Sequence, residues 1–324
     1  GVGLIGCIAL GFAAHWLWFL LIFVVARVGY SGSLIFYDSM LSDITDEERM
    51  DYVSSQGYAW GYIGSCVPFV LCLVIVLGSD TLGIHMETAM GIAFVLVAVW
   101  WLLMSLPLLK NYEQKYYVEK KPHAIAQSFK RLGETFKNMK EEKQVFMFLL
   151  AFFFYIDGVY TIIDMATAYG SALGLDSTGL LLALLVTQIV AFPCAIIFGN
   201  LSYRIRTEKL IIVCIFAYLG IAIFAVFLKT QLQFWILAIL VGMFQGGIQA
   251  LSRSYFTKII PEEHSGEYFG LMDICGKGAS FVGTTIVSIV SQLTGNISMG
   301  VGMIAILFCI GIVIFLKAVS MSRN

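Results

Sequence analysis

Two aspartates interrupt the apolar run at residues 151–170, AFFFYIDGVYTIIDMATAYG, and they raise the first question of chemistry in this sequence. Asp157 and Asp164 have no basic residue between them. At about 100° per residue, a helix would place both on one stripe with Thr161, flanked by Tyr160. Because an ionised carboxylate that faces lipid costs a few kcal/mol at the bilayer centre, we expect both to face an internal cavity.

Several roles are open to these carboxyl groups. Asp157 lies near the middle of the apolar run, and Asp164 lies nearer its C-terminal end. With Tyr160 beside them, they could bind a polar solute, and a desolvated carboxyl group could exchange protons near neutral pH. Alternatively, either group could accept hydrogen bonds from a neighbouring helix or close a gate.

A mid-membrane arginine is the second candidate. Arg27 lies inside the apolar stretch 16–38, on the same helical face as Ser31 and Asp38. A buried guanidinium favours a bidentate carboxylate partner. That partner could be a carboxylate of the solute or an aspartate of the protein such as Asp157, and the sequence favours neither.

Two amides and three further charged residues complete the set of candidates. Gln245 and Gln249 share one helical face, where they could bind a polar solute or form hydrogen bonds across helices. Arg253 follows at the end of the same span and suits a gate contact or lipid phosphates. Asp273 and Lys277 are four residues apart with the acid first, which favours an intrahelical ion pair that could also switch during transport.

The composition places these residues in a membrane. Hydrophobic residues make up 59% of the sequence and charged residues 13%, and the mean hydropathy is +0.87. A soluble domain carries roughly twice that charged fraction. The sequence therefore predicts an all-α polytopic protein that has the lipid bilayer around it and no nucleic-acid partner.

Motifs for other kinds of chemistry do not occur in the sequence. The seven cysteines lie in apolar runs without a CxxC pair, so we expect them to pack as small apolar residues. No histidine has a second ligand at metal spacing, and Walker, HExxH and GxSxG patterns are absent. We therefore expect no metal, no cofactor, no enzymatic activity and no ATP-driven step within this chain.

Apolar runs of about 20 residues predict the membrane helices. The runs are continuous rather than alternating in hydrophobicity, which indicates helices and not a barrel. Nine complete spans are predicted, and residues 1–14 look like the remainder of a tenth. The complete spans are 16–38, 55–78, 87–109, 145–168, 177–200, 208–228, 232–252, 268–292 and 296–317.

The charges outside these spans predict the orientation. Most of the 20 Lys and Arg residues fall in segments on one side of the membrane. These segments are residues 110–143, the loops after the first, fifth and seventh complete spans, and the C-terminus. The positive-inside rule places them in the cytoplasm, and we expect the chain to lie in the plasma membrane.

An internal repeat predicts the domain organisation. DSMLSDITDEERMDY at 38–52 and RSYFTKIIPEEHSGEY at 253–268 both carry an acidic pair before a Gly-rich span, about 215 residues apart. The offset indicates two six-helix halves in parallel repeat, the first incomplete by about two and a half helices. The predicted parts are the first half at 1–109, a cytoplasmic linker at 110–143 and the second half at 144–324.

The linker carries its own helical pattern. Apolar residues at steps of three and four in 123–141 predict an amphipathic helix with a basic polar face. Such a helix could lie along the membrane surface or pack on the loops of the protein itself.

Five segments together resemble one family. The sequence is similar to the autophagy-related vacuolar effluxer family and its bacterial relatives within the major facilitator superfamily, nearly from end to end. The resemblance implies a twelve-helix transporter in which residues 145–168 form the seventh helix and line the cavity, and fungal members are associated with amino-acid efflux from the vacuole. The matching segments are FYDSMLSDI, VSSQGYAWGYIGS, YIDGVYTIIDMATAYG, QIVAFPCAIIFGNLSYRI and FQGGIQALSRSYFTKIIPEE.

Two departures from the family bear on gating. In the loop GNLSYRIRTEK, Gly199 and Arg204 match the superfamily's pattern, but Tyr203 stands where an aspartate is usual. This removes the aspartate-mediated gating contact that the resemblance implies for this loop, while Arg204 remains a candidate for a gating ion pair. Asp38 and Ser39 stand where the family more often has Asn and Ala.

These observations predict a secondary transporter. We expect an efflux permease that moves a small polar solute, with amino acids as the class implied by the resemblance, by alternating access of two halves. Protons could couple to this movement, and a monomer is expected. The alternative is a membrane scaffold, a sensor or a degenerate transporter fragment that does not transport.

Overall fold

The computed structural model describes residues 1–115, 133 and 142–321, and every regular element in those residues is a helix. Nine helical segments there are long and apolar enough to cross a membrane, which confirms the predicted spans. The helices are α1 (Val2–Leu10), α2 (Trp16–Ser39), α3 (Leu41–Ile44), α4 (Met50–Leu77), α5 (Met86–Asn111), α7 (Lys143–Ala172), α8 (Ser177–Leu201), α9 (Thr207–Val226), α10 (Gln231–Ile259), α11 (Ser265–Thr294), α12 (Ile297–Gly302) and α13 (Ile304–Met321).

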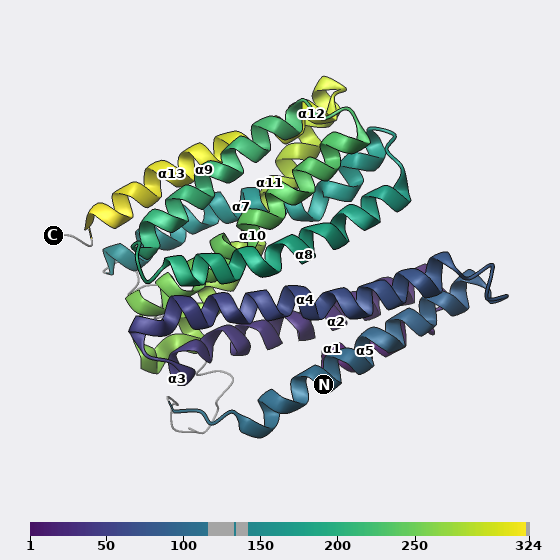
Figure 1. Cartoon of the computed structure of the whole chain (residues 1–324), viewed down its shortest axis with the longest axis horizontal. Coiled ribbons are helices and arrows are strands. Elements are labelled where there is room, and N and C mark those ends of the chain that lie inside the picture. Colours follow the sequence, from purple (N-terminus) through teal and green to yellow (C-terminus); the bar gives the residue numbers. More distant parts are fainter. Residues whose placement is uncertain (116–132, 134–141, 322–324) are drawn as a thin grey trace.

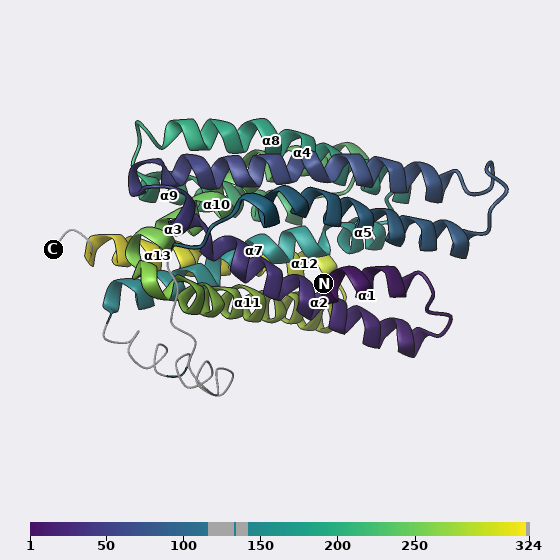
Figure 2. The ribbon, with the colours of Figure 1, turned by 90° about the horizontal axis from the view of Figure 1, so that it is seen from below.

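The helices form two groups that lie side by side. Helices α1 to α5 make up one group and α7 to α13 the other (Figure 1). The groups meet where α4 packs on α8 and α10, and where α2 packs on α11 (Figure 2). The domain boundaries at 109 and 144 remain predictions, and the amphipathic helix predicted at 123–141 lies outside the described residues except for Gly133.

The second group holds the packed core. Its centre is aromatic: Phe148, Tyr155, Phe256 and Phe315 are fully buried and joined by stacked and edge-on ring contacts, and the buried Phe308 stacks on Tyr218. By contrast, none of the most apolar window of α2 is buried. The second group therefore provides the rigid wall of any site that lies between the groups.

Small residues bring α4 and α8 close together. Ala59, Ala191 and Ala195 are fully buried between the two helices. A Cβ atom added to Gly246 of α10 would lie 2.7 Å from the Cβ of Ala195. Small side chains allow helix backbones to approach closely in a membrane, so this contact can fix how the two groups meet.

Two helices extend beyond the spans that hydropathy predicts. Helix α4 begins at Met50 instead of residue 55, and α10 continues to Ile259 instead of ending at 252. Both extensions are polar, and a hydropathy window excludes polar residues even when the helix continues through them. These extensions carry the side chains that close one end of the molecule.

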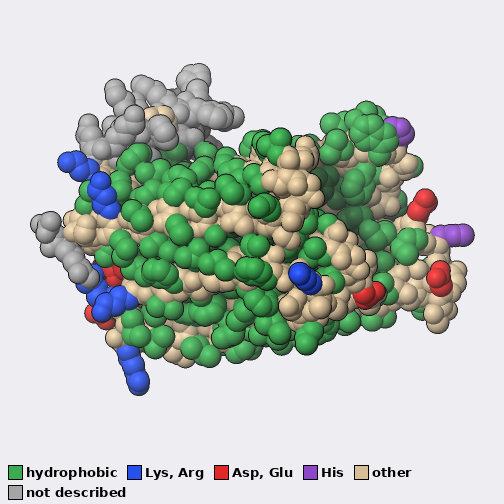
Figure 3. Space-filling view, turned by 90° about the horizontal axis from the view of Figure 1, so that it is seen from above, with side chains coloured by type: hydrophobic (Ala, Val, Ile, Leu, Met, Phe, Trp, Pro, Cys, Tyr) green, Lys and Arg blue, Asp and Glu red, His purple; other side chains and the backbone are tan. Residues whose placement is uncertain are grey.

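Basic side chains gather at that end, where α2, α8 and α10 finish and α4, α9 and α11 begin. We call it the basic end. Figure 3 shows Lys and Arg side chains at the left of a broad apolar surface, with one further basic side chain over its right half. Here the Tyr112 hydroxyl, just after α5, donates to the Asp43 carboxylate of α3. Burial, together with that carboxylate, raises the pKa of the Tyr112 hydroxyl.

Candidate functional site

A cavity of about 600 Å³ lies between the two groups of helices. Its wall comes from α2 and α4 on one side and from α7, α8, α10 and α11 on the other. Polar and aromatic side chains dominate the lining. They include Tyr30, Tyr37, Tyr58, Tyr62 and Tyr160, the amides Gln188, Gln245 and Gln249, and the charged residues Arg27, Asp38, Asp164, Arg253, Asp273 and Lys277.

Four of the six charged residues in the cavity wall are paired with each other. The Arg253 Nη1 atom lies 2.9 Å from Asp38 Oδ1, so the pair joins α10 to α2. Lys277 Nζ contacts Asp273 Oδ2 one turn away on α11, which is the intrahelical pair that the spacing favours. Each pair neutralises the charges of its two members. Two of the six charged residues in the cavity wall take no part in these pairs.

Arg27 and Asp164 are those two groups. The Arg27 guanidinium lies 5.4 Å from the centre of the Tyr30 ring, and Asp164 Oδ2 accepts a hydrogen bond of 3.2 Å from Ser280. Neither makes an ion pair with any residue of the described chain. Within the described part of the chain, the cavity wall therefore carries one cation and one anion that have no ion-pair partner.

The structure corrects the expectation that Asp157 faces the cavity. Asp157 is fully buried between α7 and α11 and is not part of the cavity lining. Its Oδ1 atom accepts hydrogen bonds from Thr161 Oγ1 at 3.2 Å and from the Gly283 N–H at 3.0 Å. Helical periodicity places Asp157 and Asp164 on one stripe, but it cannot show that α11 covers part of that stripe.

Asp157 also does not meet Arg27, which was one of the two partners left open by the sequence. Among the described residues no basic side chain pairs with Asp157, and its Oδ2 atom is buried without a hydrogen-bond partner. A buried ionised carboxylate without a cation is costly. Whether the Asp157 carboxyl group is protonated or ionised therefore depends on the groups packed around it.

The amides in the cavity differ in how they are bonded. Gln249 Oε1 accepts a hydrogen bond of 3.0 Å from the Tyr62 hydroxyl across the two groups, while Gln245 lies buried in the wall. Gln188 of α8 was not among the predicted residues, and its Oε1 atom is buried without a partner in the described chain. An amide in the middle of the apolar run 177–200 was the signal that could have identified it.

Asp51 closes the basic end of the cavity. Its carboxylate, at the start of α4, accepts hydrogen bonds from Thr207 at 2.6 Å, Ser254 at 2.5 Å and Lys258 at 2.8 Å. These four residues, which we call the latch, join α4 to α9 and α10. Asp51 is only 5% exposed, so its ion pair with Lys258 is largely screened from water.

Arg253 adds a second set of contacts next to the latch. Its Nε donates to Ser54 Oγ at 2.9 Å and its Nη2 to the Ser54 carbonyl oxygen at 3.1 Å. Its guanidinium also lies 4.9 Å from the centre of the Tyr58 ring and 5.4 Å from that of Tyr37. Arg253 is 4% exposed and contacts α2 and α4 of the opposite group, so it lies between the two groups and not at a lipid-facing surface.

Arg204 does not take part in these contacts, which corrects its assignment to a gating ion pair. Its side chain is exposed and forms no ion pair within the described residues. The turn before α9 directs Thr207 toward Asp51. The neighbouring Tyr203 instead packs on Tyr52 of α4, with ring centres 5.8 Å apart. The acid that contacts the start of α9 thus comes from α4 and not from the loop, which the loop's own sequence could not reveal.

Solved structures of other proteins share the fold of this chain. The major facilitator transporter FucP of E. coli, in its outward conformation, matches 98% of this chain and 80% of its own, with a TM-score of 0.69 and 13% identity. A bacterial homologue of the iron transporter ferroportin, in an outward-facing state, matches 98% of this chain and 82% of its own, with a TM-score of 0.63 and 15% identity. The fold, together with a cavity between two helix groups, is that of a major facilitator transporter.

Sequence comparison places the chain more narrowly. Residues 2–324 match the family described as "Vacuole effluxer Atg22 like", and the chain belongs to this family. It is 47% identical over 302 residues to the uncharacterized MFS-type transporter YxiO of Bacillus subtilis, covering 93% of this chain and 71% of that protein. It is 25% identical over 303 residues to autophagy-related protein 22 of Botryotinia fuckeliana, where it spans half of the relative's length.

Proposed function

We propose that this chain forms the greater part of a secondary transporter that exports a small zwitterionic solute, with amino acids as the class. One observation carries the proposal: Arg27 and Asp164 face the same cavity, and neither has an ion-pair partner in the described chain. A solute with one carboxylate and one ammonium would complement both. The family's description as effluxers supports export as the direction.

The proposal includes an orientation. We place the basic end, the segment between α5 and α7 and the C-terminus in the cytoplasm of a multi-pass protein of the cell membrane. The excess of Lys and Arg on that side supports this placement, as does the bacterial relative YxiO. The latch and Arg253 then close the cytoplasmic side, and transport requires these contacts to open while the opposite side closes.

Replacing Arg27 with glutamine tests the solute class. In the full-length protein reconstituted in liposomes, we expect R27Q to weaken binding of zwitterionic amino acids by roughly 30-fold or more, because the charge pair with the solute carboxylate inside the cavity is lost. The corresponding amine, which lacks the carboxylate, should bind R27Q and the unaltered protein equally. Binding is measured by competition against uptake of a labelled amino acid.

D164N provides the reciprocal measurement, and R204Q is the matched control. D164N should weaken the binding of zwitterions but not the binding of the carboxylic acid that lacks the ammonium group. R204Q removes an exposed arginine outside the cavity and should leave both affinities unchanged. Equal losses for the zwitterion and for both truncated analogues would show that Arg27 and Asp164 only maintain the structure. Absence of any transport would support the scaffold alternative.

Proton coupling belongs to the same proposal, with Asp157 as the group that binds the proton. Its burial, its free Oδ2 atom and the absence of a paired cation among the described residues support this role. We expect an imposed proton gradient to accelerate uptake by the unaltered protein, and D157N to abolish that dependence while solute exchange continues. Gradient-driven uptake by D157N that still follows pH as in the unaltered protein would exclude Asp157 as the proton site.

A further inference from the structure

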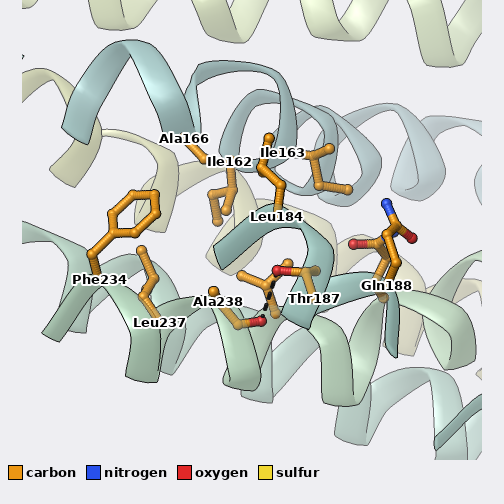
Figure 4. Close-up of a pocket in the computed structure, with 11 residues that line it drawn as sticks. Ile162, Ile163, Ala166, Leu184, Thr187, Gln188, Phe234, Leu237 and Ala238 are labelled. Carbon is orange, nitrogen blue, oxygen red and sulfur yellow. Dashed lines mark hydrogen bonds between the residues drawn. The ribbon is translucent and has the colours of Figure 1, made fainter. Parts of the chain in front are cut away.

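A second, smaller pocket adjoins the main cavity between α7, α8 and α10 (Figure 4). We call it the side pocket, and its volume is about 50 Å³. It shares three lining residues, Ile163, Gln188 and Gln245, with the main cavity. The side pocket is therefore a recess in the wall that the second helix group provides.

The interior of the side pocket is apolar. Apart from the residues shared with the main cavity, its lining is aliphatic or aromatic with one exception, Thr187. The Thr187 hydroxyl is directed at backbone carbonyl oxygens, 3.0 Å from that of Ala183 and 3.2 Å from that of Ala238, and Figure 4 shows the second of these bonds. No hydrogen-bond donor is left over to hold a polar group inside the pocket.

Polar groups lie only where the side pocket meets the main cavity. In Figure 4 the Gln188 side chain lies at the opposite end of the pocket from Phe234. Its Oε1 atom is buried and accepts no hydrogen bond from the described chain, although an unsatisfied buried acceptor costs about 1–3 kcal/mol. Asp164, the uncompensated carboxylate of the main cavity, directly follows Ile163 on α7. The junction of the two cavities therefore contains an unsatisfied acceptor, and the residue after Ile163 is an anion of the main cavity.

We infer that the side pocket is the subsite for the apolar side chain of the transported zwitterion, and that its size sets which side chains are accepted. This inference rests on the proposed function. In an α-amino acid, one carbon atom separates the ammonium group from the side chain. An ammonium group that binds Asp164 in the main cavity therefore brings the side chain near the recess, because Ile163, the residue before Asp164, lines both cavities.

The volume of the pocket gives the limit. A water-sized group needs roughly 10–15 Å³ of such space, so the side pocket accepts about three to five of them. A branched aliphatic side chain of three or four carbon atoms fills it, whereas a methyl group leaves it partly empty and a phenyl ring exceeds it. Apolar pockets discriminate a single methylene group by about tenfold or more.

Two substitutions that change the pocket in opposite directions test the inference. In liposomes containing the full-length protein, we measure how alanine, valine, leucine and phenylalanine compete for uptake. The unaltered protein should prefer valine and leucine. A166L fills the pocket and should lower their affinity about tenfold relative to alanine. L184A enlarges it and should raise the affinity for phenylalanine about tenfold relative to valine.

A168L is the matched control, because Ala168 lies on the same helix, is exposed and lines neither cavity. It should leave the ranking unchanged. If A166L does not give a monodisperse protein, the ranking of the four amino acids in L184A alone tests the subsite. An unchanged ranking in the folded variants, with transport intact and still sensitive to R27Q, would overturn the subsite and leave the proposed function standing. If no zwitterion competes with any variant, the proposed function itself fails, and the subsite with it.

Discussion

Replacing Asp51 with asparagine is expected to open the basic end of the transporter. The Asp51 carboxylate accepts three hydrogen bonds that join α4 to α9 and α10, and one of them comes from the Lys258 ammonium. Removing one partner of a buried ion pair costs about 3–5 kcal/mol, because the other charge stays buried without compensation. The latch contributes this energy only while the basic end is closed, so D51N should shift the equilibrium toward the open state by roughly two hundredfold to several thousandfold.

The distance across the basic end measures this shift. Spin labels at Arg49 and Tyr203, on the two sides of the latch and both exposed, should report a longer distance in D51N than in the parent protein with its native cysteines replaced. D46N is the matched control. Asp46 lies just before α4, is exposed, and has no side-chain hydrogen bond in the described structure. Its distance distribution should equal that of the parent.

A double-mutant cycle separates the ion pair from the rest of the latch. K258M alone should open the basic end as D51N does, and the double variant should add little to either single change, because the interaction is already lost. Additive effects would show that Asp51 and Lys258 act independently. Distances that remain those of the parent in all three variants would show that the latch does not hold the closed state.

Replacing Gly283 with alanine is expected to disrupt the packing of α7 on α11. A Cβ atom at this position would overlap the Asp157 Oδ1 and Thr161 Oγ1 atoms. The carboxyl group cannot simply rotate away, because Oδ1 also accepts the Gly283 N–H. Overpacking of this kind costs about 1–3 kcal/mol, so we expect the melting temperature of the purified protein to fall by several degrees.

Gly278 provides the control on the same helix. A Cβ atom there would have no neighbour within 4 Å, so G278A should keep or slightly raise the melting temperature through its better helix propensity. The double variant D157A/G283A should recover part of the stability that G283A loses, because alanine removes the carboxyl group that the new Cβ meets, while the Thr161 hydroxyl remains close to it. If G283A is as stable as G278A, the contact between Asp157 and Gly283 does not determine the packing of these helices.

Hydropathy was sufficient to locate the helices, but it set some of their ends wrongly. The nine spans agree with the structure because each helix must present about 20 apolar residues to lipid wherever its neighbours lie. The polar extensions of α4 and α10 escaped the same reasoning. Their residues Asp51 and Lys258 are stabilised by each other, at a separation of 207 residues in the chain, and no local pattern records such a pairing.

Periodicity was equally limited at the site. It placed Asp157, Tyr160 and Asp164 on neighbouring parts of one helix face, but only the contact of α11 separates Asp157, which is buried, from Asp164, which faces the cavity. Likewise, Arg27 and Asp38 share a face of α2, yet Asp38 pairs with Arg253 of the opposite group. The free charge on Arg27 therefore depends on how the two groups dock.

The sequence by itself determined that this chain is an all-helical membrane protein, where its spans lie and which family it resembles, because lipid imposes one requirement on every span and because the motifs are local. Only the tertiary structure decided which charges neutralise one another and which have no ion-pair partner among the described residues. Neutralisation requires an oppositely charged group within a few ångströms, and in this fold the decisive partner of Asp38 and that of Asp51 both come from helix α10 of the other group.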